Sequence, residues 1–210
     1  MTPDQIRTTP IIGLTGAAGS GKSTAANWLL VNHKNAMKFS FAKPIKVMVY
    51  ELLRATMPAK WPVGAKDYLD DPILKETPIP FLNNVTARYL MQTLGTEWGR
   101  HTVHPDFWVM IARGKVERLM GDPRHKGADM ILKCMFDDLR FANEAAMVRS
   151  FGGAVVRIER PDSSKPPSIS AHASEQQLLS PDVVVVNDGT VADLHEKLAL
   201  LWPPTVKPKA

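Results

Sequence analysis

The amino-acid sequence predicts an α/β fold with a mostly parallel sheet. Two observations lead to this fold class. Short apolar runs alternate along the chain with longer segments of helical character, as strands and crossover helices do around a parallel sheet. A glycine-rich stretch also joins the first apolar run directly to the first helical segment, which makes a strand–loop–helix unit.

Each element follows from its composition. The strand candidates are short and apolar, as expected when helices cover both faces of a sheet. We expect them at Ile11–Thr15, Ala36–Phe41, Met130–Phe136, Ala154–Glu159 and Asp182–Val186. Helices are expected at Lys22–Asn32, Pro44–Met57, Val85–His101, Asp106–Met120, Phe141–Ser150 and Val191–Leu201. The last of these follows Asn187-Asp188-Gly189-Thr190, a turn rich in residues that cap helices.

Three stretches interrupt the alternation. Pro58–Pro80 is rich in Pro, Asp and Lys, and the sequence predicts a long surface loop there. Gly121–Gly127 is predicted to be a short polar turn, and Arg160–Ser170, with its prolines and serines, a second loop. Long loops in a compact domain often serve as lids or binding elements. The tail over residues 203–210 is expected to be disordered.

Composition narrows the class of protein. The chain has 210 residues, of which 44% are hydrophobic and 22% charged, as in an ordinary globular domain. Its apolar runs are too short to span a bilayer, and residues 1–10 contain no apolar core of a secretory signal. The single cysteine, Cys134, lies in an apolar run and is expected to be buried. We therefore expect a cytoplasmic protein with no membrane partner.

The net charge of +5 would suit anionic partners. The Lys and Arg residues are nevertheless spread along the chain, with no dense run that would mark a nucleic-acid surface. We expect no nucleic-acid partner, although a nucleic-acid-binding module stays open as an alternative. Steep salt dependence of DNA or RNA binding would identify it.

The glycine-rich stretch Gly16-Ala-Ala-Gly-Ser-Gly-Lys22-Ser23 matches the phosphate-loop pattern G-x-x-x-x-G-K-[ST] at every fixed position. Its glycines let the backbone curl around an anion, so that successive N–H groups and the following helix N-terminus face phosphate oxygens. Lys22 would follow the β- and γ-phosphates, and the Ser23 hydroxyl would bind Mg²⁺, with Thr24 as a weaker candidate. The sequence therefore predicts ATP and Mg²⁺ bound by Gly16, Ala17, Ala18, Gly19, Ser20, Gly21, Lys22, Ser23 and Thr24.

A second part of the site is expected after the strand that ends at Phe136. Asp137 and Asp138 follow it directly, and an acidic residue at that edge of a parallel sheet can hold Mg²⁺ directly or through water. The sequence leaves open which of the two faces the metal, and a pair of solvated turn carboxylates is the alternative. Arginines could clamp an acceptor phosphate, although any one of them could also be a surface residue; the candidates are Arg88, Arg100, Arg140, Arg157 and Arg160.

A family resemblance adds to these motifs. The segment Thr86-Ala-Arg88-Tyr-Leu-Met-Gln92-Thr-Leu-Gly95-Thr-Glu97-Trp-Gly-Arg100 resembles the substrate-binding segment of phage deoxynucleoside monophosphate kinases, and Asp138-Leu-Arg140-Phe-Ala-Asn143-Glu144-Ala resembles their D-x-R-F-x-N-E-A stretch. Shorter matches are Phe41–Lys46, His172-Ala-Ser174-Glu175 and Asn187-Asp-Gly189. With the phosphate loop, these landmarks occur in the family's order across almost the whole chain.

The resemblance implies a P-loop fold like that of nucleoside monophosphate kinases, with a five-stranded parallel sheet and helices on both faces. It implies one domain with its core at about 9–44 and 128–202, a helical substrate-binding insertion at about 45–120, and a lid at about 160–176. By this resemblance, Arg88, Gln92 and Arg100 would contact the acceptor nucleotide. We also expect Lys43, Thr93, Glu97 and Trp98 at the acceptor site, with a core position as the alternative for Trp98. The catalytic group would comprise Lys22, Asp138, Arg140 and Arg160, with Ser23 and Asp138 at the metal.

Two residues depart from the family pattern: Lys43 stands where an acid is more common, and Asp137 adds a second carboxylate beside Asp138. The resemblance also implies transfer of the ATP γ-phosphate to a deoxynucleoside monophosphate (dNMP), in the host cytoplasm if the protein is phage-encoded, and a possible homodimer. Kinases of other phosphorylated metabolites, such as phosphomevalonate or dephospho-coenzyme A, share this plan. An ATPase or GTPase switch is a third class, although the guanine-reading motif N-K-x-D is absent. Base preference stays open.

Overall fold

The computed structural model describes residues 3–33, 35–122, 133–161 and 179–205. The chain forms two compact units. The first comprises Met1–Ser40 and Ala112–Ala210, and the second comprises Phe41–Ile111. Among the described residues, no helix is long and apolar enough to cross a membrane.

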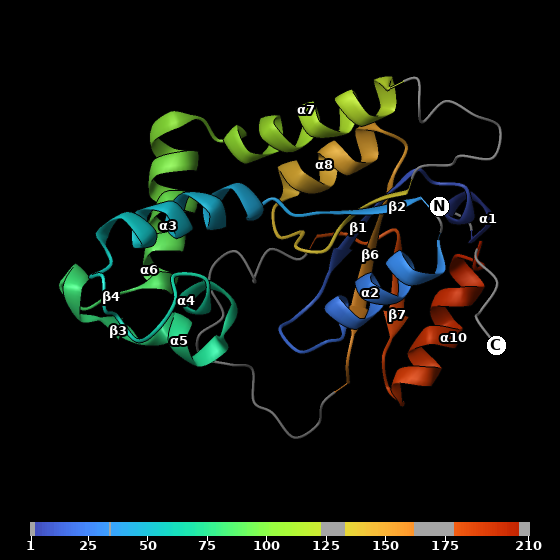
Figure 1. Ribbon diagram of the computed structural model, residues 1–210. Coiled ribbons are helices and arrows are strands. Elements are labelled where there is room, and N and C mark those ends of the chain that lie inside the picture. Colours follow the sequence, from blue (N-terminus) through green and yellow to red (C-terminus); the bar gives the residue numbers. More distant parts are fainter. Residues whose placement is uncertain (1–2, 34, 123–132, 162–178, 206–210) are drawn as a thin grey trace. The chain divides into compact units, whose positions relative to one another are not determined.

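The first unit is built on a five-stranded sheet (Figure 1). Its strands are β1 Ile11–Thr15, β2 Ala36–Phe39, β5 Lys133–Phe136, β6 Ala154–Glu159 and β7 Val183–Val186. They lie in the order β2-β5-β1-β6-β7, and every neighbouring pair is parallel. The predicted parallel α/β sheet is therefore confirmed, with β2 ending two residues early and residues 130–132 of the third expected strand outside the described residues.

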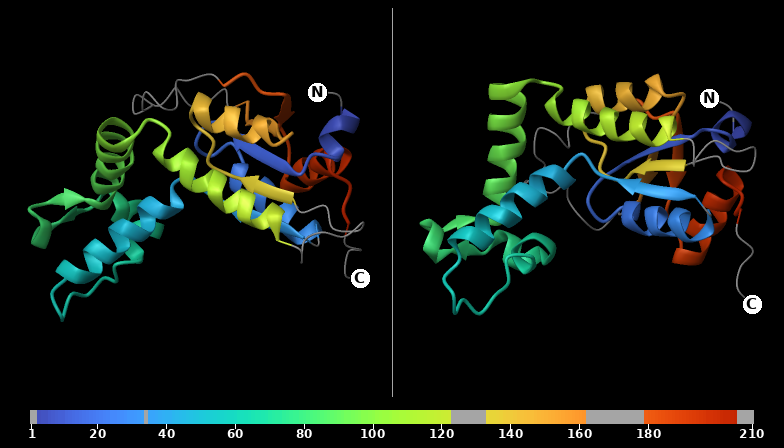
Figure 2. Two further views of the ribbon diagram at one scale, coloured as in Figure 1. Left: turned by 90° about the horizontal axis from the view of Figure 1, so that it is seen from above. Right: turned by 45° about the horizontal axis from the view of Figure 1, so that its top comes forward.

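Helices cover both faces of this sheet. Helices α2 Lys22–Asn32 and α10 Val191–Leu201 lie on one face, and α8 Ala142–Ser150 lies on the other, as the views in Figures 1 and 2 agree. The side chains of alternate β1 residues pack on opposite faces of the sheet. Ile12 and Leu14 join the core beneath α2 and α10, whereas a Cβ on Gly13 would lie only 2.7 Å from the Leu139 side chain. The short helix α1 Pro3–Arg7 buries Ile6 in the first of these cores.

The second unit has its own apolar core. Its elements in chain order are α3 Lys43–Thr56, α4 Asp67–Asp70, α5 Pro72–Glu76, β3 Pro78–Ile79, the 3₁₀ turn η1 Pro80–Leu82, β4 Val85–Thr86, α6 Ala87–Gln92 and the π-helix η2 Thr93–Val103. Helix α7 Phe107–Gly121 begins in this unit. Val49 and Leu53 of α3 are fully buried together with Ile79, Ala87 and Trp108. The segment is therefore packed around a core of its own residues.

Two expectations for this unit were wrong. The stretch Pro58–Pro80 is not one surface loop, because Tyr68 and Leu69 of α4 and Ile79 of β3 are buried in the core. The stretch Val85–His101 is not one α-helix: it opens as strand β4, continues as α6 and then widens into the π-helix η2. Trp108 accounts for part of that widening, since its indole N–H donates to the Gly95 carbonyl (2.7 Å) and its ring packs against Gly99.

Candidate functional site

All five strands of the first unit end at the same edge of the sheet, because they are parallel. Polar and charged residues follow each of them there: Gly16–Lys22 after β1, Ser40 after β2, Asp137 and Asp138 after β5, Arg160 after β6, and Asn187 after β7. In open α/β sheets, ligands bind at this carboxyl edge, where the strand order changes direction on either side of the first strand. The candidate site therefore lies around the end of β1.

The phosphate loop has the geometry of an anion cradle. Gly21 stands at the N-cap of α2 with φ 103°, and Gly19 has φ 76°, so both occupy the left-handed region that favours glycine. Residues Ala17, Ala18 and Gly19 are exposed, while Ser20 is buried beneath them. A turn of this kind presents backbone N–H groups on one side and the positive end of α2 beside them.

Lys22 closes this loop. Its ammonium donates to the carbonyl of Gly16 (2.7 Å) and to that of Ala17 (2.6 Å). Ser23 is exposed and Thr24 half-buried, both in the first turn of α2. The Lys22 ammonium is thus folded back onto the loop, and the exposed Ser23 lies at its helix end.

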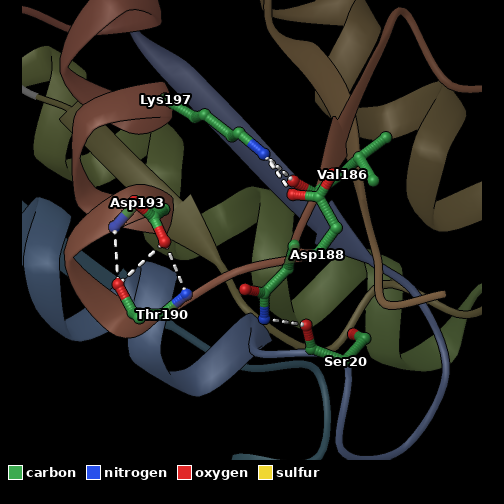
Figure 3. A network of polar contacts seen from close by, with 7 residues as sticks. Ser20, Val186, Asp188, Thr190, Asp193 and Lys197 are labelled. Atoms are coloured by element: carbon green, nitrogen blue, oxygen red, sulfur yellow. Dashed lines mark hydrogen bonds and ion pairs between the residues drawn. The ribbon is translucent and has the colours of Figure 1, made fainter. Parts of the chain in front are cut away.

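The β7–α10 connection packs against the loop and is itself held by polar contacts (Figure 3). The Asn187 side-chain amide donates to the Ser20 carbonyl at 2.9 Å. Lys197 of α10 reaches back to the Asp188 carboxylate (2.5 Å) and to the Val186 carbonyl (2.8 Å). Polar contacts therefore tie the connection to the phosphate loop, to β7 and to α10.

A capping box begins α10 at the end of this connection. The Thr190 N–H and hydroxyl both donate to the Asp193 carboxylate (2.6 and 2.8 Å), and the Asp193 N–H donates to the Thr190 hydroxyl. These hydrogen bonds hold the pKa of Asp193 below its ordinary value. The hydrogen bond from Lys197 does the same for the pKa of Asp188. Both carboxylates are therefore ionised near neutral pH, as the contacts require.

A pocket of about 450 Å³ lies where the phosphate loop and the β7–α10 connection meet. Its lining residues are Gly19, Gly21, Lys22, Ser23, Thr24, Arg160, Asn187, Gly189, Thr190, Val191 and Leu194. Two of them are cations, and the described lining contains no acidic residue. The volume is in the usual range for small-ligand sites, roughly 300–1,000 Å³. A phosphorylated ligand of nucleotide size is therefore compatible with its charge and volume.

The two carboxylates after β5 have different partners. The ammonium of Lys38, on the neighbouring strand β2, forms an ion pair with Asp137 at 2.5 Å. The Asp138 carboxylate accepts a hydrogen bond from the Ser40 hydroxyl at 2.6 Å. The charge of Asp137 is thus neutralised by Lys38. Asp137 is therefore the weaker of the two candidates for holding a bound cation.

The donor set fits Mg²⁺, which prefers oxygen ligands and keeps several waters. The oxygens in question are the Ser23 hydroxyl at the start of α2 and the Asp138 carboxylate after β5. Within the described residues there is no group of three or more His, Cys, Asp or Glu side chains that could hold a metal alone. An ion at this edge would therefore share its coordination with ligand phosphate oxygens and water.

The arginines expected near the phosphates lie in different settings. Arg160 lines the pocket, whereas Arg140 is exposed just before α8, where its backbone N–H donates to the Glu144 carboxylate (2.8 Å). Arg157 on β6 donates a hydrogen bond to the Leu179 carbonyl, before β7, and forms an ion pair with Glu159 (3.5 Å). The lid over 160–176 and His172 lie outside the described residues, except for Arg160 and Pro161.

The residues expected at the acceptor site all lie in the second unit. Arg88 on α6 forms an ion pair with Glu76 (2.6 Å), and Arg100 donates to the Pro105 carbonyl (3.3 Å). Glu97 pairs with His101 in the π-helix (3.4 Å). The remaining four are placed as follows: Lys43 is exposed at the start of α3, Gln92 and Thr93 are half-buried where α6 meets η2, and Trp98 is 38% exposed.

The segment from Arg88 to Arg100 does not bury all of its large apolar side chains. Tyr89 is 57% exposed, and Trp98 is 38% exposed while its ring contacts Phe107 and Trp108. Leu90 and Leu94 do pack against the core of the unit. The segment therefore presents aromatic surface outward, beside half-buried Arg88 and Arg100.

A cluster of three cations in the second unit was only partly visible from the sequence. It consists of Lys46 on α3, Lys75 on α5 and Arg88 on α6. Lys46 pairs with Asp70 (3.5 Å) and Arg88 with Glu76, whereas Lys75 has no ion-pair partner among the described residues. Partial burial, together with the charges of Lys46 and Arg88, lowers the pKa of Lys75. The surroundings thus disfavour the charged form of Lys75, and lysines with such shifted pKa values often occur at functional sites.

Ser40, Asn187 and Lys75 are not assigned to a site by the sequence. Asn187 directly follows an expected strand, and that signal could have identified it. Ser40 falls inside the expected strand Ala36–Phe41, whereas β2 ends at Phe39. Lys75 gives no such signal, because it lies in the stretch Pro58–Pro80 that the sequence predicts as a loop.

Comparison with known proteins identifies the family of this chain. The family model described as deoxynucleotide monophosphate kinase matches residues 68–198. A protein of Acanthamoeba polyphaga mimivirus, provisionally named a deoxynucleotide monophosphate kinase, is 27% identical over 194 residues, which cover 90% of this chain and 93% of the viral protein. Because the family match spans more than half of the chain, the protein belongs to the deoxynucleotide monophosphate kinase family.

Proposed function

We propose that this protein transfers the γ-phosphate of ATP to the phosphate of a deoxynucleoside monophosphate, which yields ADP and a deoxynucleoside diphosphate (dNDP). The observation that carries the proposal is the phosphate loop at the wall of a cation-lined pocket of nucleotide size. Membership of the deoxynucleotide monophosphate kinase family supports the choice of acceptor. The substrates are small molecules, and the reaction requires no nucleic-acid or membrane partner.

On the donor side, the loop residues 16–23 bind the triphosphate through backbone N–H groups. Lys22 stabilises the negative charge that moves from the γ-phosphate toward ADP, and Arg160 in the pocket lining adds a second cation. Ser23 and Asp138 would hold Mg²⁺, which supplies charge neutralisation of the phosphate oxygens when it is bound. Ser40 orients the Asp138 carboxylate by its hydrogen bond. Arg140 is assigned to the phosphates by the family pattern.

On the acceptor side, we assign the second unit to dNMP binding, within an insertion over about 45–120. Arg88 and Arg100 are the cations of the family segment, and Lys46 and Lys75 supplement Arg88. Gln92, Thr93 and Glu97 would supply hydrogen bonds to the nucleoside, the exposed Trp98 an aromatic face, and Lys43 a further cation. The residues of about 160–176 would act as the lid that excludes water.

The proposed phosphate transfer does not require a strong general base. A phosphate oxygen of the acceptor is already anionic, so it can attack the γ-phosphorus without first losing a proton. Catalysis then depends on holding the two phosphates in line and on stabilising the charge that develops between them. Both tasks can be met by the cations and N–H donors named above.

A coupled assay of ADP release tests the proposal. The acceptor panel comprises the four common dNMPs, the matching ribonucleotides, phosphomevalonate and dephospho-coenzyme A, each with ATP and Mg²⁺. We expect rapid ADP release with one or more dNMPs and its near-complete loss in Lys22→Ala. ADP release at the same rate without any acceptor would instead indicate an ATPase, and selective use of another metabolite would replace the acceptor.

A further inference from the structure

We propose that Asn187 is a positioning residue that sets the orientation of the Ser20–Gly21 peptide, so that the Gly21 N–H faces the bound polyphosphate. The inference rests on the proposed function insofar as the phosphate loop is taken to bind the donor triphosphate. It assigns a role to a residue outside the loop motif, 167 positions from Ser20 along the chain.

The contact is direct and shielded from water. Asn187 is 6% exposed, and its side-chain Nδ2 lies 2.9 Å from the Ser20 carbonyl oxygen. The backbone of Asn187 is anchored as well, because its N–H donates to the Glu159 carbonyl of β6 at 2.6 Å. The amide therefore reaches the loop from a backbone position that the sheet defines.

Peptide geometry turns this contact into control of a donor. The described chain contains no cis peptide bond, so the carbonyl of Ser20 and the N–H of Gly21 point in opposite directions across one planar unit. Holding the carbonyl on the side of Asn187 directs the Gly21 N–H to the other side. A peptide turned the other way would present a carbonyl oxygen, rather than an N–H donor, to a phosphate.

The amino-acid type at position 21 agrees with this role. A Cβ at Gly21 would lie 2.6 Å from the Asn187 Nδ2 atom, so a side chain there would collide with the amide. Gly21 also has φ 103°, at the N-cap of α2. Glycine at position 21 therefore allows the positive φ of the loop and leaves room for the Asn187 side chain beside it.

The flanks of Asn187 are braced from both directions. Lys197 holds the carbonyl of Val186 on one side and the carboxylate of Asp188 on the other (Figure 3). Two residues further on, Thr190 is fixed by its capping box with Asp193. These contacts limit the freedom of the backbone that carries Asn187, as a positioning role requires.

Asn187 could instead contact the nucleoside of the donor, since it lines the pocket, or could serve only the stability of the fold. Inorganic tripolyphosphate distinguishes these roles because it has phosphates but no nucleoside. Binding of tripolyphosphate and of ATP should be measured by calorimetry for the wild-type chain, Asn187→Ala and a matched control, Asn32→Ala. The Asn32 amide donates to the Trp28 carbonyl at the same 2.9 Å, away from the pocket lining.

We expect Asn187→Ala to weaken tripolyphosphate and ATP by the same factor, about tenfold, which corresponds to about 1.4 kcal/mol. The KM for ATP should rise while the KM for the dNMP stays unchanged. Asn32→Ala should lower the melting temperature about as much as Asn187→Ala does, without changing the affinity for tripolyphosphate or for ATP. If Asn187→Ala is too unstable to assay, the near-isosteric Asn187→Asp takes its place. We expect Asn187→Asp to weaken tripolyphosphate and ATP binding by more than tenfold, because it places a carboxylate oxygen against the Ser20 carbonyl.

Unchanged tripolyphosphate affinity in the Asn187 variants would overturn the inference, whether ATP binding fell or not. Failure of the wild-type chain to bind ATP or tripolyphosphate would be a different result. It would remove the proposed donor site itself, so the two failures can be told apart.

Discussion

Replacing Gly21 by Ala should destabilise the fold more than the same change at Gly19. Both residues have positive φ, 103° and 76°, so each alanine variant incurs backbone strain of about 1–2 kcal/mol. At Gly19 a new Cβ has open space around it, and strain is the whole cost. At Gly21 the Cβ would lie 2.6 Å from Asn187 Nδ2 and would displace that amide from Ser20. Loss of this hydrogen bond leaves buried polar groups unpaired, which adds about 1–3 kcal/mol.

We therefore expect a loss of unfolding free energy of roughly 2–5 kcal/mol for Gly21→Ala and about 1–2 kcal/mol for Gly19→Ala. Urea unfolding followed by far-ultraviolet circular dichroism measures both. The entropy that alanine removes from the unfolded chain is the same in the two variants, so it cancels in their difference. Equal losses, or a greater loss for Gly19→Ala, would refute the reasoning that Asn187 occupies the space beside Gly21.

Three further predictions concern the metal site, the second unit and the buried cysteine. Asp138→Asn should lower the rate of phosphate transfer at limiting Mg²⁺ by about 10–100-fold, whereas Asp137→Asn should have a much smaller effect, because Lys38 already neutralises that carboxylate; kcat measured against Mg²⁺ concentration compares the two. Lys75→Met should raise the KM for the dNMP about tenfold without lowering the melting temperature at neutral pH. The reason is that folding lowers the pKa of Lys75 below its ordinary 10.5, so the folded protein disfavours the charged side chain at neutral pH. That destabilisation fades as the pH rises toward 10.5, and at neutral pH the loss of the charge costs no stability. Burial raises the pKa of the Cys134 thiol from 9.0 to about 11, so its protonated form contributes stability that is lost between those pH values. At pH 8, iodoacetamide should therefore modify the native thiol roughly a hundredfold more slowly than the unfolded one, and comparable rates would contradict the burial.

The sheet was predictable because its signals are local. The strands β1 and β6 and the helices α2 and α10 have the expected bounds, since each apolar run is limited by glycine, proline or capping residues within a few positions. The burial of Cys134 was also predictable from the apolar run around it and is confirmed.

The second unit was less predictable. Helices as short as α4 and α5 contain too few turns to show a helical period, so the prolines and charges around them indicated a loop. The π-helix η2 depends on a contact with Trp108, which lies beyond it in the chain and leaves no periodic signal in Thr93–Val103 itself.

The site divides in the same way. The phosphate loop is one contiguous motif, and its residues could be named from the sequence alone. The pairing of Asp138 with Ser40, and of Asn187 with Ser20, requires knowledge of which strands are neighbours at the edge of the sheet. The choice between Asp137 and Asp138 likewise depended on Lys38 of the adjacent strand β2.

The most direct test of the central claim is to identify the product. Purified protein is incubated with ATP, Mg²⁺ and each dNMP in turn, and the mixture is followed by ³¹P nuclear magnetic resonance. The proposed function predicts that the monophosphate signal of one or more dNMPs is replaced by the two phosphorus signals of a dNDP, with one ADP formed for each. Formation of ADP and inorganic phosphate, while every dNMP stays unchanged, would contradict it.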